Sequence, residues 1–191
     1  AVQVNQGPVG LDRLNWTQVT GTGNELESVD LNMTAALELA VTGTMTLDAF
    51  GFVVATGTLT LEKSTATIDD GNVAIGSFDA NVMVLTLENV NLFAGVGGSL
   101  NANGAGLADD TVNKDNGIGF YVEGVSLKLV TVQNTADLTK KYTGLELSLS
   151  EAGLVGIPDL TLKVSGAVQV NQGPVGLDRL NWTQVTGTGN E

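Results

Sequence analysis

The first 25 residues of the chain return, unchanged at every position, as its last 25. The segment AVQVNQGPVGLDRLNWTQVTGTGNE occupies residues 1–25 and again residues 167–191, so the two copies are 166 positions apart. An internal repeat with a long period is typical of proteins that are built from successive copies of one structural unit. We therefore expect residues 1–166 to form one full repeat unit and residues 167–191 to begin the next one.

The position of the repeat boundary constrains the fold further. Around it, apolar or small side chains alternate with polar ones, which is typical of a β-strand with one apolar face. The alternating residues are Leu160, Leu162, Val164, Gly166, Val168 and Val170. The boundary between Gly166 and Ala167 falls in the middle of this predicted strand, so residues 1–5 correspond to a strand's second half. Three explanations stay open: a window on a longer tandem array, an engineered duplication, or a strand-exchange polymer whose terminal segment completes a neighbouring copy.

Signals for strands and turns dominate the rest of the sequence. The chain has 42% apolar residues, 25 glycines and only 5% aromatic residues, a mixture typical of strands joined by tight turns. The clearest alternation runs from Val29 to Leu47. Further strands are expected at 73–77, 82–93, 118–132 with a break at Gly124, 144–149 and 160–171, and one short helix is expected at 136–142.

These patterns predict an all-β fold, an elongated β-solenoid-like or twisted-sheet rod built from tandem repeats. The alternative is a β-sandwich bead for each repeat. The strand that crosses the repeat boundary without a linker favours the rod, because successive units would then share sheet structure.

The charged and reactive residues exclude several classes of function. The chain has 21 acidic and 8 basic residues, a net charge of −13, and no run of Lys or Arg that could neutralise phosphates, so we expect no nucleic-acid partner. It has no Cys and no His, which removes cysteine nucleophiles, the commonest general base and the commonest zinc ligand. The chain has no stretch of 18 apolar residues, so we expect no membrane insertion. We therefore expect the protein not to be an enzyme.

Several segments carry a resemblance to known proteins. They read GTMTLDAFGFVVATGTLTLEKS, VNLFAGVGGSL, GIGFYVEGVSLKLVTV and YTGLELSLSEAGLVGIPDLTLKVSGAVQVN. In this order, over about 37–170, they resemble the tandem-repeat modules of very large secreted or surface bacterial proteins. The resemblance implies an extracellular or cell-surface repeat unit, and it carries no catalytic residue.

One loop has the residues of a cation site. Asp109, Asp110, Asn113 and Asp115 precede Gly117 within nine residues, and oxygen ligands in a glycine-terminated loop are how extracellular modules hold Ca²⁺. The spacing is not that of an EF-hand. The sequence predicts Ca²⁺ binding at these four residues and no other cofactor.

Two functions fit these observations. The first is a structural repeat of an extracellular fibre, filament or surface stalk, whose partners are neighbouring copies of the same repeat. The second is an adhesin-type binding module that recognises carbohydrate or another cell surface. Trp16 and its copy Trp182 are the only tryptophans, and an exposed tryptophan can stack on a sugar ring.

Overall fold

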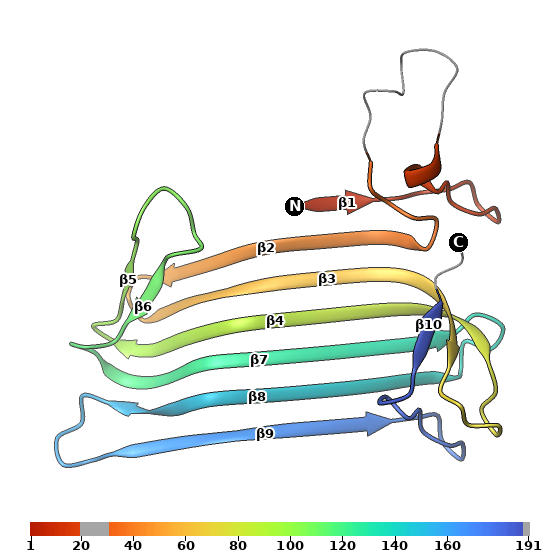
Figure 1. Cartoon of the computed structure of the whole chain (residues 1–191). Helices are drawn as coiled ribbons and strands as arrows, with labels where there is room; N and C mark the ends of the chain where they lie inside the picture. Colours follow the sequence, from red (N-terminus) through yellow and green to blue (C-terminus); the bar gives the residue numbers. More distant parts are fainter. Residues whose placement is uncertain (20–30, 189–191) are drawn as a thin grey trace, which may run out of the picture.

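One broad antiparallel β-sheet dominates the computed structural model, which describes residues 1–19 and 31–188. Its strands follow the order β1-β2-β3-β4-β7-β8-β9, with β10 paired to β3 beside this path (Figure 1). The strands are β1 (Val2–Val4), β2 (Leu37–Ala49), β3 (Val53–Asp69), β4 (Phe78–Val96), β7 (Ile118–Asn134), β8 (Lys141–Val155), β9 (Leu162–Gln172) and β10 (Thr186–Thr188). A separate two-stranded sheet contains β5 (Ser99–Asn101) and β6 (Thr111–Asn113). The all-β prediction is confirmed.

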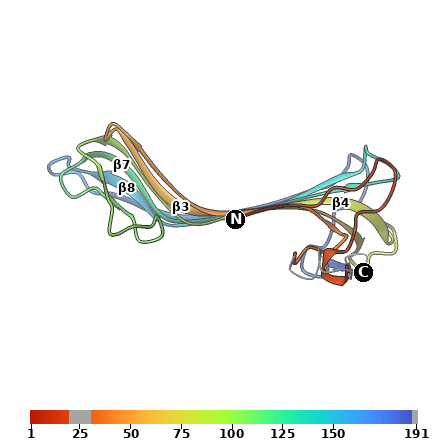
Figure 2. The same cartoon turned by 90° about the horizontal axis from the view of Figure 1, so that it is seen from above.

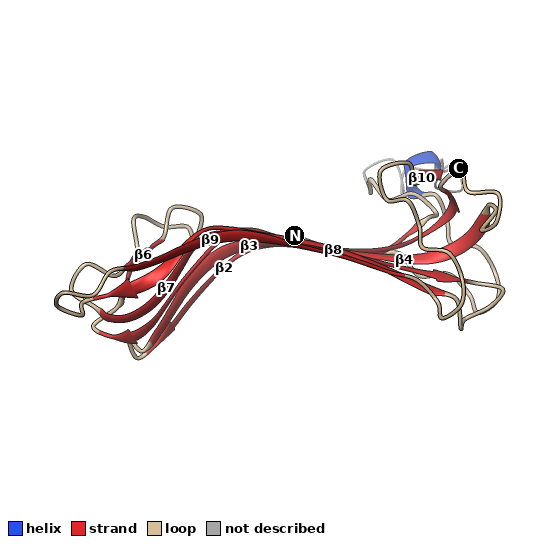
Figure 3. Cartoon of the chain, turned by 90° about the horizontal axis from the view of Figure 1, so that it is seen from below, coloured by secondary structure: helices blue, strands red, loops and turns tan. Residues whose placement is uncertain are grey.

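Helical structure is minimal. A single turn of 3-10 helix, η1 (Trp16–Gln18), follows β1 and lies at the same end of the sheet as β10 (Figure 3). Within the described ranges 1–19 and 31–188, no helix is long and apolar enough to cross a membrane.

The central strands are unusually long. β4 has 19 residues, which at about 3.3 Å per residue extend over roughly 60 Å. A tight turn joins β2 to β3: the Phe52 amide donates to Ala49 O at 3.0 Å, and the two central residues, Phe50 and Gly51, both have positive φ angles, as a type I′ turn requires. The Gly51 amide also donates to Asp48 Oδ1 at 2.8 Å.

The middle of the sheet is a single layer with one apolar face. Seen edge-on, the sheet is thin at its centre and carries its loops at the two ends (Figure 2). Two rows of directly opposed side chains cross it from β2 to β9: Val41, Leu61, Leu85, Leu129, Leu145 and Val170, and Gly43, Leu59, Leu87, Leu127, Leu147 and Val168. The leucines are only half-buried, so they pack against their neighbours within each row.

The buried side chains lie toward the two ends of the sheet. At one end, Ile68, Ala80, Val132, Tyr142 and Leu180 form a hydrophobic cluster. At the other, Val54 and Phe93 are fully buried and Tyr121 is nearly so, on directly paired positions of β3, β4 and β7. Each end therefore has a small core of its own beside the short elements that cover it.

One local prediction was wrong in part and two were wrong. The strand predicted from Val29 to Leu47 is present from Leu37 onward; Val29 and Asp30 lie outside the described residues, and 31–36 are not strand. The segment 73–77 is a turn in which Asn72 O accepts from the Ile75 and Gly76 amides. The helix expected at 136–142 is also a turn, because Asn134 Oδ1 takes the Ala136 and Asp137 amides, and β8 begins at Lys141.

Other strand predictions are confirmed. The expected strands at 82–93 and 118–132 lie within β4 and β7, and the expected break at Gly124 is present as a positive φ beside a register shift between β4 and β7. The predicted strand across 160–171 corresponds to β9. The twisted sheet is thus seen as one antiparallel sheet, while its continuation into a rod or solenoid stays a prediction.

Candidate functional site

The four predicted Ca²⁺ ligands lie in and beside β6. Asp109 and Asp110 precede β6, Asn113 ends it, and Asp115 follows it. In the part of the chain that the structure describes, no three acidic side chains gather closely enough to hold a metal ion, so Asp109, Asp110 and Asp115 do not form such a group. Asn113 Oδ1 instead accepts the Asp115 amide at 3.0 Å.

Asp110 is the one residue of this set with an unusual environment. It is 9% exposed, and its Oδ1 atom is buried without a hydrogen-bond partner among the described residues. A buried carboxylate oxygen normally accepts a hydrogen bond or faces a cation. Ca²⁺ binding at Asp109, Asp110, Asn113 and Asp115 stays a prediction, and the buried Oδ1 atom of Asp110 is the observation that favours it.

Where the structure describes both copies of the repeated segment, they make the same internal hydrogen bonds. Asn5 Nδ2 donates to Leu14 O at 2.9 Å and Trp16 Nε1 donates to Asn5 Oδ1 at 3.0 Å. Asn171, Leu180 and Trp182 repeat both bonds at the same two distances. The turns match as well, because the amides of Leu11 and Leu177 bond to Pro8 and Pro174. The segment is therefore a small preformed unit, held by an asparagine and a tryptophan.

The two copies contact different partners. In the first copy, Arg13 donates to Ala35 O at 2.9 Å and to Ala36 O at 3.0 Å, beside the start of β2, while Leu14 is 57% exposed. In the second copy, Leu180 is 1% exposed within the hydrophobic cluster, while Arg179 is exposed. The segment thus has two binding faces, and each copy uses only one of them.

Polar contacts fix the second copy to the sheet. The Asn181 amide donates to Asp70 Oδ2 at 2.9 Å, and Asn72 Nδ2 donates to Asp178 Oδ2 at 3.1 Å. Trp182 lies over Gly144, where a Cβ atom would come within 2.7 Å of the indole ring. Both tryptophans are therefore engaged in holding the segment, which does not favour a role in sugar stacking.

Sequence analysis missed this docking surface. The turn 69–72 is visible in the sequence as a turn signal, but nothing in it shows that Asp70, which is 2% exposed, caps a segment 111 residues away. The alternation of β9 did predict a strand that continues into the second copy.

A row of polar and charged side chains crosses β7, β8 and β9. Tyr121 on β7 donates to Glu151 on β8, and Lys163 on β9 donates to Glu151 Oε2 at 3.0 Å. The hydrogen bond from Tyr121, then that from Lys163, lowers the pKa of Glu151. The bond to Glu151 raises the pKa of Lys163, and with some burial it also raises the pKa of Tyr121. These shifts follow from hydrogen bonds and an ion pair between neighbouring strands.

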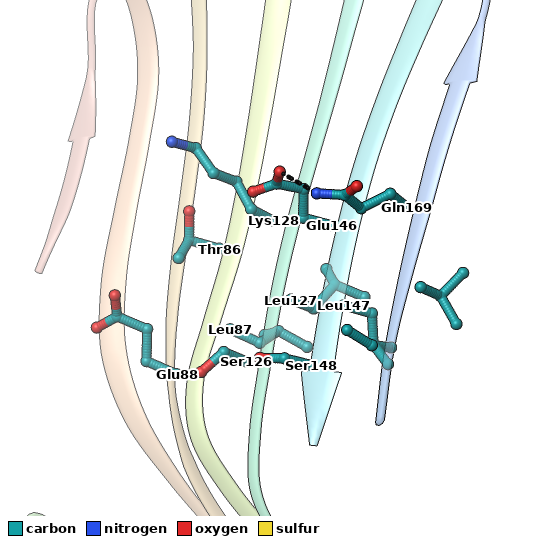
Figure 4. Close-up of a pocket in the computed structure, with 12 residues that line it drawn as sticks. Thr86, Leu87, Glu88, Ser126, Leu127, Lys128, Glu146, Leu147, Ser148 and Gln169 are labelled. Atoms are coloured by element: carbon teal, nitrogen blue, oxygen red, sulfur yellow. Dashed lines mark hydrogen bonds between the residues drawn. The ribbon is translucent and has the colours of Figure 1, made fainter. Parts of the chain in front are cut away.

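The middle of the sheet contains a shallow hollow of about 310 Å³ (Figure 4). Lys128, Glu146 and Gln169 line it on the polar face, and Gln169 Nε2 donates to Glu146 Oε1 at 3.0 Å. Leu127 and Leu147 line it on the apolar face. Because its lining comes from both faces of one layer, the hollow marks the thin centre of the sheet and does not suggest an enclosed substrate site.

The two outer edges of the sheet are the remaining candidate site. β9 is exposed at every residue, and among residues 1–19 and 31–188 no strand pairs with its outer edge. At the opposite edge, β1 covers only the first part of β2, from Leu39 to Val41. The rest of that edge carries Met45 and Leu47, which are 40% and 52% exposed.

Comparisons with known proteins assign no family. No family model matches the sequence, and no curated protein or solved structure is significantly similar to the chain.

Proposed function

We propose that the chain is a structural repeat unit of an extracellular fibre, filament or surface stalk, in which tandem copies extend one β-sheet. The observation that carries this proposal is the two-faced repeated segment. One copy docks against the start of β2 and the other against Asp70 and the hydrophobic cluster at the same end of the sheet, and both keep the same internal hydrogen bonds. A segment between two successive units would use both faces at once and would join them.

The single-layer sheet suits a mechanical role. Its cohesion comes from ladders of hydrogen bonds between long strands and from apolar rows that run across all strands from β2 to β9. Both features continue unchanged when strands are added at an edge. With six long strands per unit at about 4.8 Å each, one unit would lengthen the assembly by about 29 Å.

The extracellular setting is proposed from the resemblance to secreted bacterial repeat modules. The high acidic charge fits it, because a net charge of −13 per chain keeps extended assemblies soluble.

The test is electron microscopy of proteins that contain two and four tandem copies of residues 1–166, each closed by residues 1–25. We expect stiff ribbons about as wide as β4 is long, with a length that grows by about 29 Å for each added unit. The two-unit protein is the matched control for the four-unit protein. Globular beads joined by bending junctions would contradict the proposal, and carbohydrate binding by such beads would favour the adhesin-type module.

A further inference from the structure

We propose that β9 of one chain pairs, antiparallel, with β2 of a second copy of this chain, with Val168 opposite Val41 and Val164 opposite Met45. The inference rests on the proposed function and deepens it, because it names the surfaces and the register by which units join. The partner is another copy, whether it follows in the same polypeptide or arrives as a separate chain.

The register comes from the strand pair that the structure already contains. β1 pairs with β2 so that Val2 lies opposite Val41 and Val4 lies opposite Leu39. Val168 and Val170 are the same residues in the second copy of the segment. β9 therefore carries, within a longer strand, the very sequence that recognises β2.

Continuing this ladder of strand pairs brings two further pairs of exposed apolar side chains together. Four residues before Val168 is Val164, and four residues after Val41 is Met45, so they become neighbours; Leu162 and Leu47 follow in the same way. All four are exposed, at 53% for Val164, 40% for Met45, 45% for Leu162 and 52% for Leu47. The row that ends at Val168 then continues into the row that begins at Val41 of the next copy.

β9 lacks the usual protection of an edge strand. Edge strands are commonly shielded by prolines, several charges or bulges that turn the edge away. β9 reads LKVSGAVQVNQ, with no proline and a single charged residue, Lys163. It is 11 residues long and exposed throughout, which fits a strand that is meant to be paired.

Exchange between separate chains replaces one copy of the repeated segment by the other, identical copy. When the second copy in one chain displaces residues 1–19 from another, Arg179 takes the place of Arg13 at Ala35 and Ala36, and the same contacts form again. Leu180 meanwhile stays in the hydrophobic cluster of its own chain. The exchange adds the pairs from Leu162 to Gly166, so the assembled state has more paired strand than two separate chains.

The inferred pair of Val164 and Met45 has a geometry that a disulfide can span. The Thr42 amide bonds to Ala1 O and the Asn5 amide to Glu38 O, which makes the Val2 and Val4 positions the non-hydrogen-bonded pairs of this ladder. Val164 and Met45 fall in the same phase. In such pairs the Cα atoms lie about 4.5 Å apart, within the range that a disulfide spans.

The experiment mixes the full chain carrying Val164→Cys with the full chain carrying Met45→Cys under mild oxidation. The protein has no cysteine of its own, so each cross-link is unambiguous. We expect a disulfide-linked dimer of twice 19.6 kDa, and a ladder in steps of 19.6 kDa when one chain carries both changes. The matched control replaces Met45→Cys by Thr46→Cys, the adjacent residue on the opposite face, and we expect at least about tenfold less dimer from it.

Each outcome decides the inference. A dimer with Met45→Cys and little with Thr46→Cys supports it, and Leu162→Cys with Leu47→Cys serves as a second in-register pair should the first impair folding, which circular dichroism reports. Equal cross-linking at positions 45 and 46, or none at either in-register pair, overturns it. If ribbons of the expected length form without these cross-links, the proposed function stands and only the inferred register fails. If the cross-links form without ribbons, the register stands and the proposed function fails.

Discussion

The ring of Phe93 lies among glycines that leave no room for a side chain. A Cβ atom on Gly98 would come within 2.2 Å of the Phe93 ring, and one on Gly117 within 2.7 Å. We expect Gly98→Ala to destabilise the fold by roughly 1–3 kcal/mol, because the fully buried ring has nowhere to move. Gly106→Ala is the control: its added methyl meets nothing within 4 Å, and we expect a change between zero and a gain of about 1 kcal/mol. Urea unfolding with an unchanged slope measures both, and equal effects would contradict the packing argument.

The hydrogen bond from Tyr121 to Glu151 contributes to the response of the fold to acid. Its hydrogen bond holds the pKa of Glu151 below the ordinary value of 4.5, so the ionised carboxylate stabilises the folded state above that pH. This stabilisation is lost as the pH falls through the lowered pKa of the folded state. In Tyr121→Phe we expect the pKa of Glu151 to rise and the acid-induced loss of stability between about pH 7 and about pH 3 to become smaller. Urea unfolding at both pH values tests this against Tyr142→Phe, and identical acid sensitivity in the two variants would refute it.

At the scale of elements, the two copies of the repeated segment provide an internal control. Leu180 and Leu14 are the same residue of that segment, but Leu180 is 1% exposed and Leu14 is 57% exposed. We expect Leu180→Ala to lower the free energy of unfolding by about 2–5 kcal/mol, because it opens a cavity beside Ile68 and Tyr142. Leu14→Ala should change it by less than about 0.5 kcal/mol. Thermal and urea unfolding compare the two variants, and equal losses would mean that the segments are docked alike.

The long elements were predictable because strand alternation is a local property. β4, β7 and β9 follow the apolar alternation of their own residues, which is read directly from the sequence. The errors occur where side chains compete with the backbone for amide hydrogen bonds. The side chains of Asn134 and Asp137 accept backbone amides within the segment predicted as a helix, and Asn72 Oδ1 accepts the Ala74 amide where a strand was expected. The docking of Asn181 on Asp70 depends on contacts between residues 111 positions apart, and no local pattern encodes such a contact.

Sheet extension and net charge have opposite effects on the association of copies. The long exposed edge of β9 and the uncovered part of β2 favour association, because each added copy completes a ladder of hydrogen bonds. The net charge of −13 on each chain opposes it, since like-charged units repel one another. The balance depends on ionic strength, because salt weakens repulsion between exposed charges and leaves the apolar pairs largely unaffected.

Salt should therefore control assembly of the unmodified chain. Between about 0.01 M and about 0.15 M salt the screening length falls from about 30 Å to about 8 Å, which is shorter than the roughly 29 Å spacing of successive units. We expect association, followed by light scattering, to begin at a protein concentration that is lower by roughly tenfold or more at the higher salt. Val164→Lys is the control, because a charge in the inferred strand pair should prevent association at either salt concentration while leaving the unfolding midpoint of the single chain nearly unchanged. Association that weakens with added salt would mean that contacts between opposite charges, and not the pairing of β9 with β2, hold the copies together.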